Sequence, residues 1–146
     1  EALTDTNGLE AVKVTFDSGI LFATGSANLS TTAMTSLFQF ANVLKNNADC
    51  DVAVQGYTDN AGWKNSTAAQ SQQKNLELSQ QRAQSVTNYL LQQGVSPAQI
   101  RSTMGFGEAN PVADNATAAG KAQNRRVEVY MYASQKMIQE AQQQAQ

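Results

Sequence analysis

The chain has 146 residues, a net charge of −2 and a charged content of 15%, values typical of one soluble globular domain with a substantial core. This charge balance excludes the basic surface of a typical nucleic-acid binder, and no run approaches the roughly 18 apolar residues of a membrane-spanning helix. The absence of histidine removes the most common general base and metal ligand, and the single cysteine, Cys50, allows no internal disulfide. We interpret Cys50 as a small, half-buried apolar residue rather than a reactive thiol.

The first half of the chain predicts two strands on either side of a helix. Residues 11–16 alternate between apolar and polar side chains, as in a strand, whereas residues 17–29 are rich in glycine and hydroxyl side chains and predict a loop. Ser30 is a favourable N-cap residue for a helix expected over residues 31–47. Residues 52–57 alternate again and predict the second strand. The apolar stripe expected on the helix comprises Met34, Leu37, Phe38, Ala41 and Leu44.

A long polar stretch separates the second strand from a second helix. Residues 59–73 are polar and of low complexity, so the helix begins either near Ser66 or near Lys74, and it extends to Gln93. Gly94 then ends it as a C-cap residue. The apolar stripe expected on this helix comprises Leu76, Ala83, Val86 and Leu90.

The last third of the chain predicts two further strands, over residues 100–106 and 125–132, with a long loop over residues 107–123 between them. Helices that alternate with strands in this way must cover one face of a single sheet, which predicts an α/β fold of two layers.

We divide the chain into three parts. Residues 1–9 form a flexible N-terminal segment, residues 10–133 form the domain, and residues 134–146 form a Gln-rich terminal helix or tail.

Three polar side chains near the second helix combine into a candidate ligand site. Asp59 directly follows the second strand, at the carboxyl end of the sheet, where ligands bind in open α/β folds. Asn75 and Arg82 are seven residues apart, almost two helical turns, and therefore share one face. An acid and a fixed cation that face one cleft form a receptor for a ligand carrying both an ammonium and a carboxylate. Taken alone, however, the spacing favours a turn residue at Asp59 and a solvated arginine at Arg82.

Four segments of the sequence resemble the OmpA-like C-terminal (OmpA/MotB) peptidoglycan-binding domain family. They are GYTDN (56–60), LSQQRAQSV (78–86), GFGEANP (105–111) and NRRVEVYMY (124–132). The resemblance runs from about Val12 to Tyr132. Members of that family hold the peptidoglycan of the bacterial cell wall without cutting it. The resemblance implies a β-α-β-α-β-β fold, an α+β sandwich with both helices on one face of a mixed four-stranded sheet, followed here by an extra C-terminal helix.

The resemblance also implies how the site works. It gives Asp59 the ammonium and Arg82 the carboxylate at the side-chain end of diaminopimelate, a residue of the peptidoglycan stem peptide. The other ligand-binding residues that it implies are Asn75, Arg125, Thr58 and Asp17.

Two of these assignments have alternatives. Arg125 is the first arginine of the NRR motif, and Arg126 could take its place because strand alternation sends the two to opposite faces. Asp17 either contacts the ligand or stabilises the loop that begins there.

The resemblance places the protein on the periplasmic side of the outer membrane of a Gram-negative bacterium, as part of an outer-membrane protein or lipoprotein. Its anchor would be a segment or lipid outside this chain. It implies a binding protein without cofactor, metal or nucleic-acid partner. A wall hydrolase is disfavoured, because the sequence contains no recognisable Ser/Lys, Cys/His or zinc set.

One departure from the family pattern lies between Asp59 and Asn75, where this chain has about eight extra residues within 62–73. The insertion either lengthens the front of the second helix or forms a lid with Trp63 as a wall of the site. It also motivates an alternative function, a periplasmic protein-interaction or regulatory module on the same fold.

Overall fold

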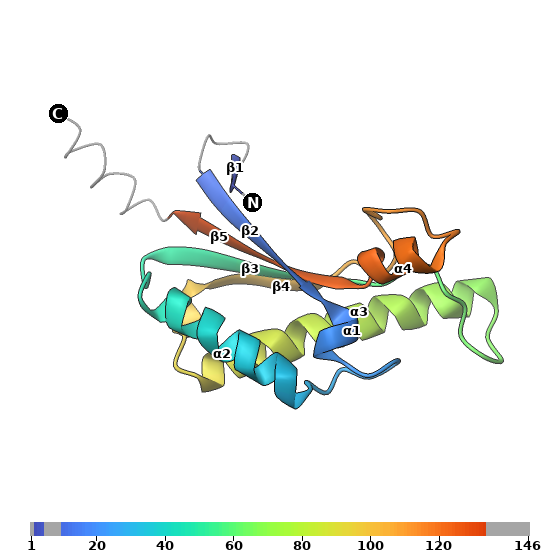
Figure 1. Ribbon diagram of the computed structural model, residues 1–146, viewed down its shortest axis with the longest axis horizontal. Coiled ribbons are helices and arrows are strands. Elements are labelled where there is room, and N and C mark those ends of the chain that lie inside the picture. Colours follow the sequence, from blue (N-terminus) through green and yellow to red (C-terminus); the bar gives the residue numbers. More distant parts are fainter. Residues whose placement is uncertain (1, 5–9, 134–146) are drawn as a thin grey trace.

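The computed structural model describes residues 2–4 and 10–133, in which the two long helices pack on one face of a β-sheet (Figure 1). The strands are β1 (Ala2–Thr4), β2 (Glu10–Asp17), β3 (Cys50–Tyr57), β4 (Ile100–Gly105) and β5 (Arg126–Ala133). The helices are α1 (Ser18–Leu21), α2 (Thr31–Lys45), α3 (Ala68–Gln92), the short 3-10 helix η1 (Pro97–Gln99) and α4 (Ala118–Asn124).

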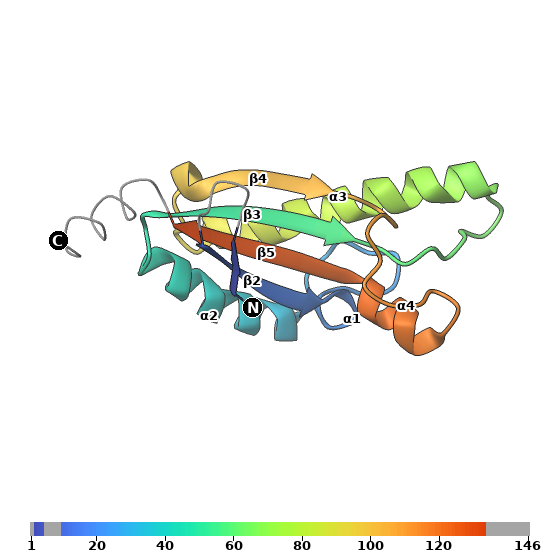
Figure 2. The same ribbon diagram turned by 90° about the horizontal axis from the view of Figure 1, so that it is seen from above.

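The described strands form one mixed sheet in the order β1-β2-β5-β3-β4 (Figure 2). β3 and β4 run parallel, and the other neighbouring pairs are antiparallel. The register aligns Val14, Val129 and Val54 in one row across β2, β5 and β3, on the face that the helices cover. The predicted two-layer fold and its four strands are therefore confirmed.

β1 is a fifth strand, and it lies within the N-terminal segment 1–9 that the sequence predicts to be flexible. Residues 2–4 pair with the outer edge of β2, with Ala2 opposite Val12, because an edge strand offers unpaired backbone groups. The remainder of that segment and the predicted helix or tail over residues 134–146 lie outside the described residues.

The hydrophobic core lies between the sheet and the helices α2 and α3. Three predicted positions of α2 are buried, namely Leu37, Ala41 and Leu44. Met34 and Phe38 are instead 40% and 45% exposed, and Ala33 and Phe40 are buried in their place. The prediction was wrong at Met34 and Phe38 because two overlapping apolar stripes on α2 share Leu37, Ala41 and Leu44, and the sequence alone did not show which of the two stripes faces the sheet. On α3, Leu76 is 42% exposed for a related reason, since the helix instead buries the neighbouring polar residues Asn75 and Ser79.

The helix boundaries show that residues 68–73 of the insertion belong to α3. α3 begins directly after Thr67, whose hydroxyl accepts a hydrogen bond from Gln70 N while the Gln70 side chain accepts one from Thr67 N, a capping box. Part of the insertion therefore lengthens the helix. Two predicted loops contain short helices, α1 with its N-cap Asp17 and α4 with its N-cap Thr117. Side-chain caps stabilise both helices, and neither has an apolar stripe long enough to predict it.

Two glycines bring α3 close to the sheet. A Cβ on Gly56 would lie 2.3 Å from the carbonyl oxygen of Ser79, and one on Gly105 would lie 2.2 Å from the backbone nitrogen of Gln80. No side chain fits at these distances, so the backbone of α3 rests directly on β3 and β4. This contact fixes the position of Arg82, which follows within one helical turn.

Candidate ligand-binding site

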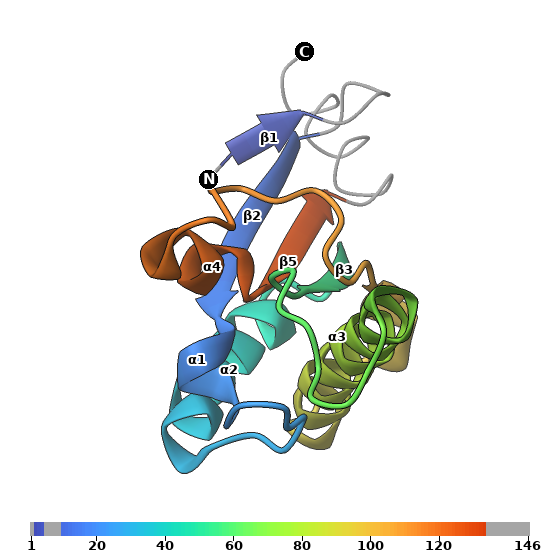
Figure 3. The ribbon, with the colours of Figure 1, turned by 90° about the vertical axis from the view of Figure 1, so that its right-hand side faces the viewer.

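A cleft of about 620 Å³ lies at the carboxyl end of β3. Seen from this end, α1, the loop that follows it, the loop after β3 and the front of α3 gather around the same edge of the sheet (Figure 3). α3 extends beyond the end of β3 (Figure 2). The loop before α3 lines the cleft from Ala61 to Lys64, and the helix itself lines it from Asn75 onward. The lining includes the predicted residues Thr58, Asp59, Asn75, Arg82 and Arg125.

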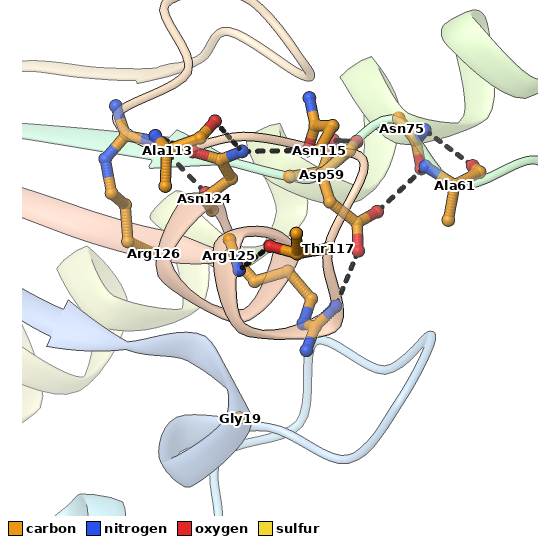
Figure 4. Close-up of polar contacts among 12 residues, drawn as sticks. Gly19, Asp59, Ala61, Asn75, Ala113, Asn115, Thr117, Asn124, Arg125 and Arg126 are labelled. Atoms are coloured by element: carbon orange, nitrogen blue, oxygen red, sulfur yellow. Dashed lines mark hydrogen bonds and ion pairs between the residues drawn. The ribbon is translucent and has the colours of Figure 1, made fainter.

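Asp59 is the acidic side chain of the cleft and is 6% exposed. Its Oδ1 accepts a hydrogen bond from the backbone N–H of Ala61 at 2.9 Å, and its Oδ2 forms an ion pair with Arg125 Nη1 at 2.6 Å (Figure 4). The sheet explains this pair, because antiparallel pairing of Tyr57 with Arg126 brings the residues after β3 beside the residue before β5. The Arg125 side chain is 39% exposed, so it borders solvent while Asp59 lies beneath it.

Arg82 is 4% exposed and is held by the loop after α1. Its Nε donates to Ser26 O at 2.8 Å and its Nη2 to Ala23 O at 3.2 Å, and the guanidinium carbon lies 5.0 Å from the centre of the Phe22 ring. Burial, and then the nearby Arg125, lower the pKa of Arg82, against the opposing effect of Asp59. An incoming carboxylate would compensate for this cost of a buried positive charge. Nη1 takes part in none of the hydrogen bonds among the described residues and is available to such a ligand.

Two of the predicted residues position their neighbours. Asn75 accepts a hydrogen bond from Trp63 Nε1 at 2.8 Å and donates one to Ala61 O at 3.1 Å, so its amide braces the loop after β3. The hydroxyl of Thr58 donates to the backbone oxygen of Asp59 at 2.8 Å. Both residues line the cleft, but their polar groups support the Asp59 loop.

Asp17 does not line the cleft, although the resemblance places it among the site residues. Its carboxylate accepts a hydrogen bond from Gly19 N at 2.7 Å and caps α1. It lines a separate, smaller hollow of about 390 Å³. Stabilisation of its own loop, the alternative from the sequence, therefore describes it.

Arg126 is excluded from the cleft because it points to the other face of the sheet. There its Nε forms an ion pair with Glu128 at 2.7 Å, and both side chains are 5% exposed or less. Its guanidinium carbon lies 3.9 Å from the centre of the Tyr57 ring.

The charges of the cleft favour a ligand that carries an anionic group together with one cationic group. Asp59 is accompanied by three cations, Lys64, Arg82 and Arg125, although the whole chain carries a net charge of −2. Lys64 and the loop after α1 were not predicted, since only the folded chain brings them to the cleft.

In the described part of the chain, no cluster of three potential metal ligands occurs and no helix is long and apolar enough to cross a membrane. Cys50 is buried at the start of β3, and burial raises the pKa of its thiol.

Comparison with known proteins identifies the family, because the OmpA family matches residues 21–125. The chain belongs to the OmpA family. It is 47% identical over 116 residues to the probable lipoprotein YiaD of Escherichia coli K12, and the aligned region covers 80% of this chain and 46% of that protein. It is 41% identical over 110 residues to the peptidoglycan-binding protein ArfA of Mycobacterium bovis, covering 75% and 31%. The chain thus spans less than half the length of these curated relatives.

The solved structures include a similar fold in the cell wall anchor of the T6SS from Pseudomonas aeruginosa. That structure has a TM-score of 0.73 and 30% sequence identity, and the match covers 91% of this chain and 88% of that one.

Proposed function

We propose that this OmpA-family domain binds bacterial peptidoglycan without catalysing a reaction, through the diaminopimelate of the stem peptide. The observation that carries the proposal is one buried acid, Asp59, and one buried guanidinium, Arg82, in the same cleft. The side chain of diaminopimelate ends in an ammonium and a carboxylate on one carbon. Asp59 accepts hydrogen bonds from the ammonium, Arg82 binds the carboxylate through Nη1, and Arg125 adds a second cation beside it.

The relatives support this binding role. ArfA is named as a peptidoglycan-binding protein, and the Pseudomonas structure is named as a cell wall anchor. We place the domain on the periplasmic side of the outer membrane, where it anchors the membrane to the wall through a segment or lipid outside this chain. The match to a probable lipoprotein supports that location.

Calorimetric titration with free meso-diaminopimelate tests the proposal, and 1,5-diaminopentane is the matched ligand control. This diamine carries an ammonium at each end of the same five-carbon chain without either neighbouring carboxylate, so we expect it to bind at least about tenfold more weakly. This comparison needs no variant and depends on the pairing of both charges.

Variants then locate the site. Asp59→Asn and Arg82→Lys are expected to weaken binding to diaminopimelate and to isolated sacculi by at least about tenfold. Glu77→Gln and Arg101→Lys make the same chemical changes at exposed positions away from the cleft and should bind as wild type. The proposal is wrong if folded wild-type protein binds neither ligand nor sacculi, or if both cleft variants bind normally. A protein-interaction role would then replace it.

A further inference from the structure

Trp63 is the only tryptophan in the sequence, and it lies in the wall of the cleft that contains Asp59 and Arg82. It belongs to the polar loop between β3 and α3, where it is the large apolar side chain. Its indole is only half-buried. An exposed aromatic surface beside two buried charges needs an explanation beyond packing.

The ring is fixed in place by α3. The backbone N–H of Trp63 donates to Ser71 Oγ at 2.8 Å, and the indole Nε1 donates to Asn75 Oδ1 at 2.8 Å. Ser71 and Asn75 lie one turn apart on the front of the helix, so both N–H groups of Trp63 are satisfied by the same element. A wall held in this way is ordered before a ligand arrives, which reduces the entropic cost of binding.

The tip of the ring reaches the opposite side of the cleft. Gly25 has a left-handed φ of +69°, and a Cβ built on it would lie 3.9 Å from Trp63 Cη2. The loop that contains Gly25 is the one that Arg82 holds through the backbone oxygens of Ala23 and Ser26. Trp63 therefore bridges from α3 to this loop and closes one side of the cleft.

Trp63 also supplies the accessible apolar surface. The other large apolar side chains that line the cleft, Phe22 and Leu78, are 3% and 8% exposed. In diaminopimelate, the ligand that we propose, the charged end that lies between Asp59 and Arg82 is carried on an aliphatic chain. Such a chain finds its apolar partner at the indole.

We propose that Trp63 is a ligand-contacting residue whose indole packs against the aliphatic chain behind the charged end of the bound amino acid. This inference rests on the proposed function, since it concerns the same ligand. It assigns the affinity for the uncharged part of the ligand to the loop that carries Trp63, and the choice of charged end to Asp59 and Arg82.

Intrinsic fluorescence tests the contact in the wild-type protein. Because Trp63 is the only tryptophan, titration with meso-diaminopimelate should change its emission saturably, with the same Kd as calorimetry. Calorimetric binding without any change in emission would overturn the inference and leave the proposed function intact. Absence of binding by both methods would instead contradict the proposed function.

Three substitutions separate the ring from its hydrogen bond. Trp63→Ala is expected to weaken binding about tenfold. Trp63→Phe keeps an aromatic wall but loses the bond to Asn75, and should stay within about threefold of wild type. Lys74→Ala is the control, because Lys74 Nζ lies 5.8 Å from the ring centre yet does not line the cleft, and it should bind normally. Equal weakening in Trp63→Ala and Trp63→Phe would assign the effect to the bracing of Asn75 and overturn the inference. So would wild-type affinity in Trp63→Ala.

Discussion

Replacing Gly105 with alanine tests whether the close contact between α3 and the sheet positions the binding site. The added Cβ would lie 2.2 Å from Gln80 N and 2.5 Å from Ser79 Oγ, whereas ordinary contacts begin at 3.4 Å. Because protein interiors are already close-packed, α3 and β4 must separate by about 1 Å. Overpacking of this kind costs roughly 1–3 kcal/mol. For a domain of this size, the melting temperature should fall by about 3–12 °C.

The same displacement should weaken ligand binding. Gly105 N donates to the side chain of Gln80 at 2.8 Å, and Gly107 N, in the loop after β4, donates to Ser79 Oγ at 2.9 Å. Separation of α3 from β4 strains both hydrogen bonds. Arg82 lies within one turn of these contacts and moves with the helix. Its position relative to Asp59 changes, and affinity for diaminopimelate should fall together with stability.

Thermal unfolding followed by circular dichroism measures the first effect, and calorimetry at a temperature where the variant is folded measures the second. Gly62→Ala is the matched control for stability, because its Cβ would meet nothing closer than Ser71 Oγ at 3.7 Å. We expect that control to stay within about 0.5 kcal/mol of wild type. If Gly105→Ala melts at the same temperature as Gly62→Ala, the helix is not held at this distance and the reasoning fails.

Three further predictions concern the stability of the domain. Glu128→Gln leaves the buried Arg126 without its carboxylate and should cost about 3 kcal/mol in urea unfolding; an unchanged midpoint would contradict this. Burial raises the pKa of Tyr57 and of Tyr130, and at Tyr130 the hydrogen bond to Glu128 raises it further. The unfolded chain therefore releases these protons at a lower pH than the folded protein, and stability should fall as pH rises above about 10. Absorbance at alkaline pH should show these two tyrosines ionising later in the folded protein than in urea, and coincident titrations would refute the shift. Ser30→Ala removes the N-cap of α2 and should cost about 1 kcal/mol, again by urea unfolding, with no loss counting against the cap.

Long elements were predictable because their signals are local. Alternation within residues 11–16 and 52–57 and the cap at Ser30 lie within the elements that they predict. The short elements were missed because their stability comes from elsewhere. β1 depends on the edge of β2, and α4 depends on its own last residue, Asn124, whose side chain bonds to the loop before the helix.

The candidate site was predictable in its charges and less so in its details. The family resemblance identified Asp59, Arg82 and Arg125, and the fold places all three in one cleft. Helical periodicity put Arg82 at the border of the core, whereas it is 4% exposed. Its carbonyl partners lie more than 50 positions away in the sequence, at Ala23 and Ser26, so no local pattern could show them.

The long segment between Asp59 and Asn75 keeps the two charges in register because the extra residues join existing elements. Residues 68–73 extend α3 at its front and leave the phase between Asn75 and Arg82 unchanged. The loop before them is tied back at both ends, by Ala61 N to Asp59 and by Trp63 to α3. Asp59 therefore stays at the end of β3 whatever the length of the loop. A change of length there alters the wall of the cleft and leaves the pair of charges, Asp59 and Arg82, in place.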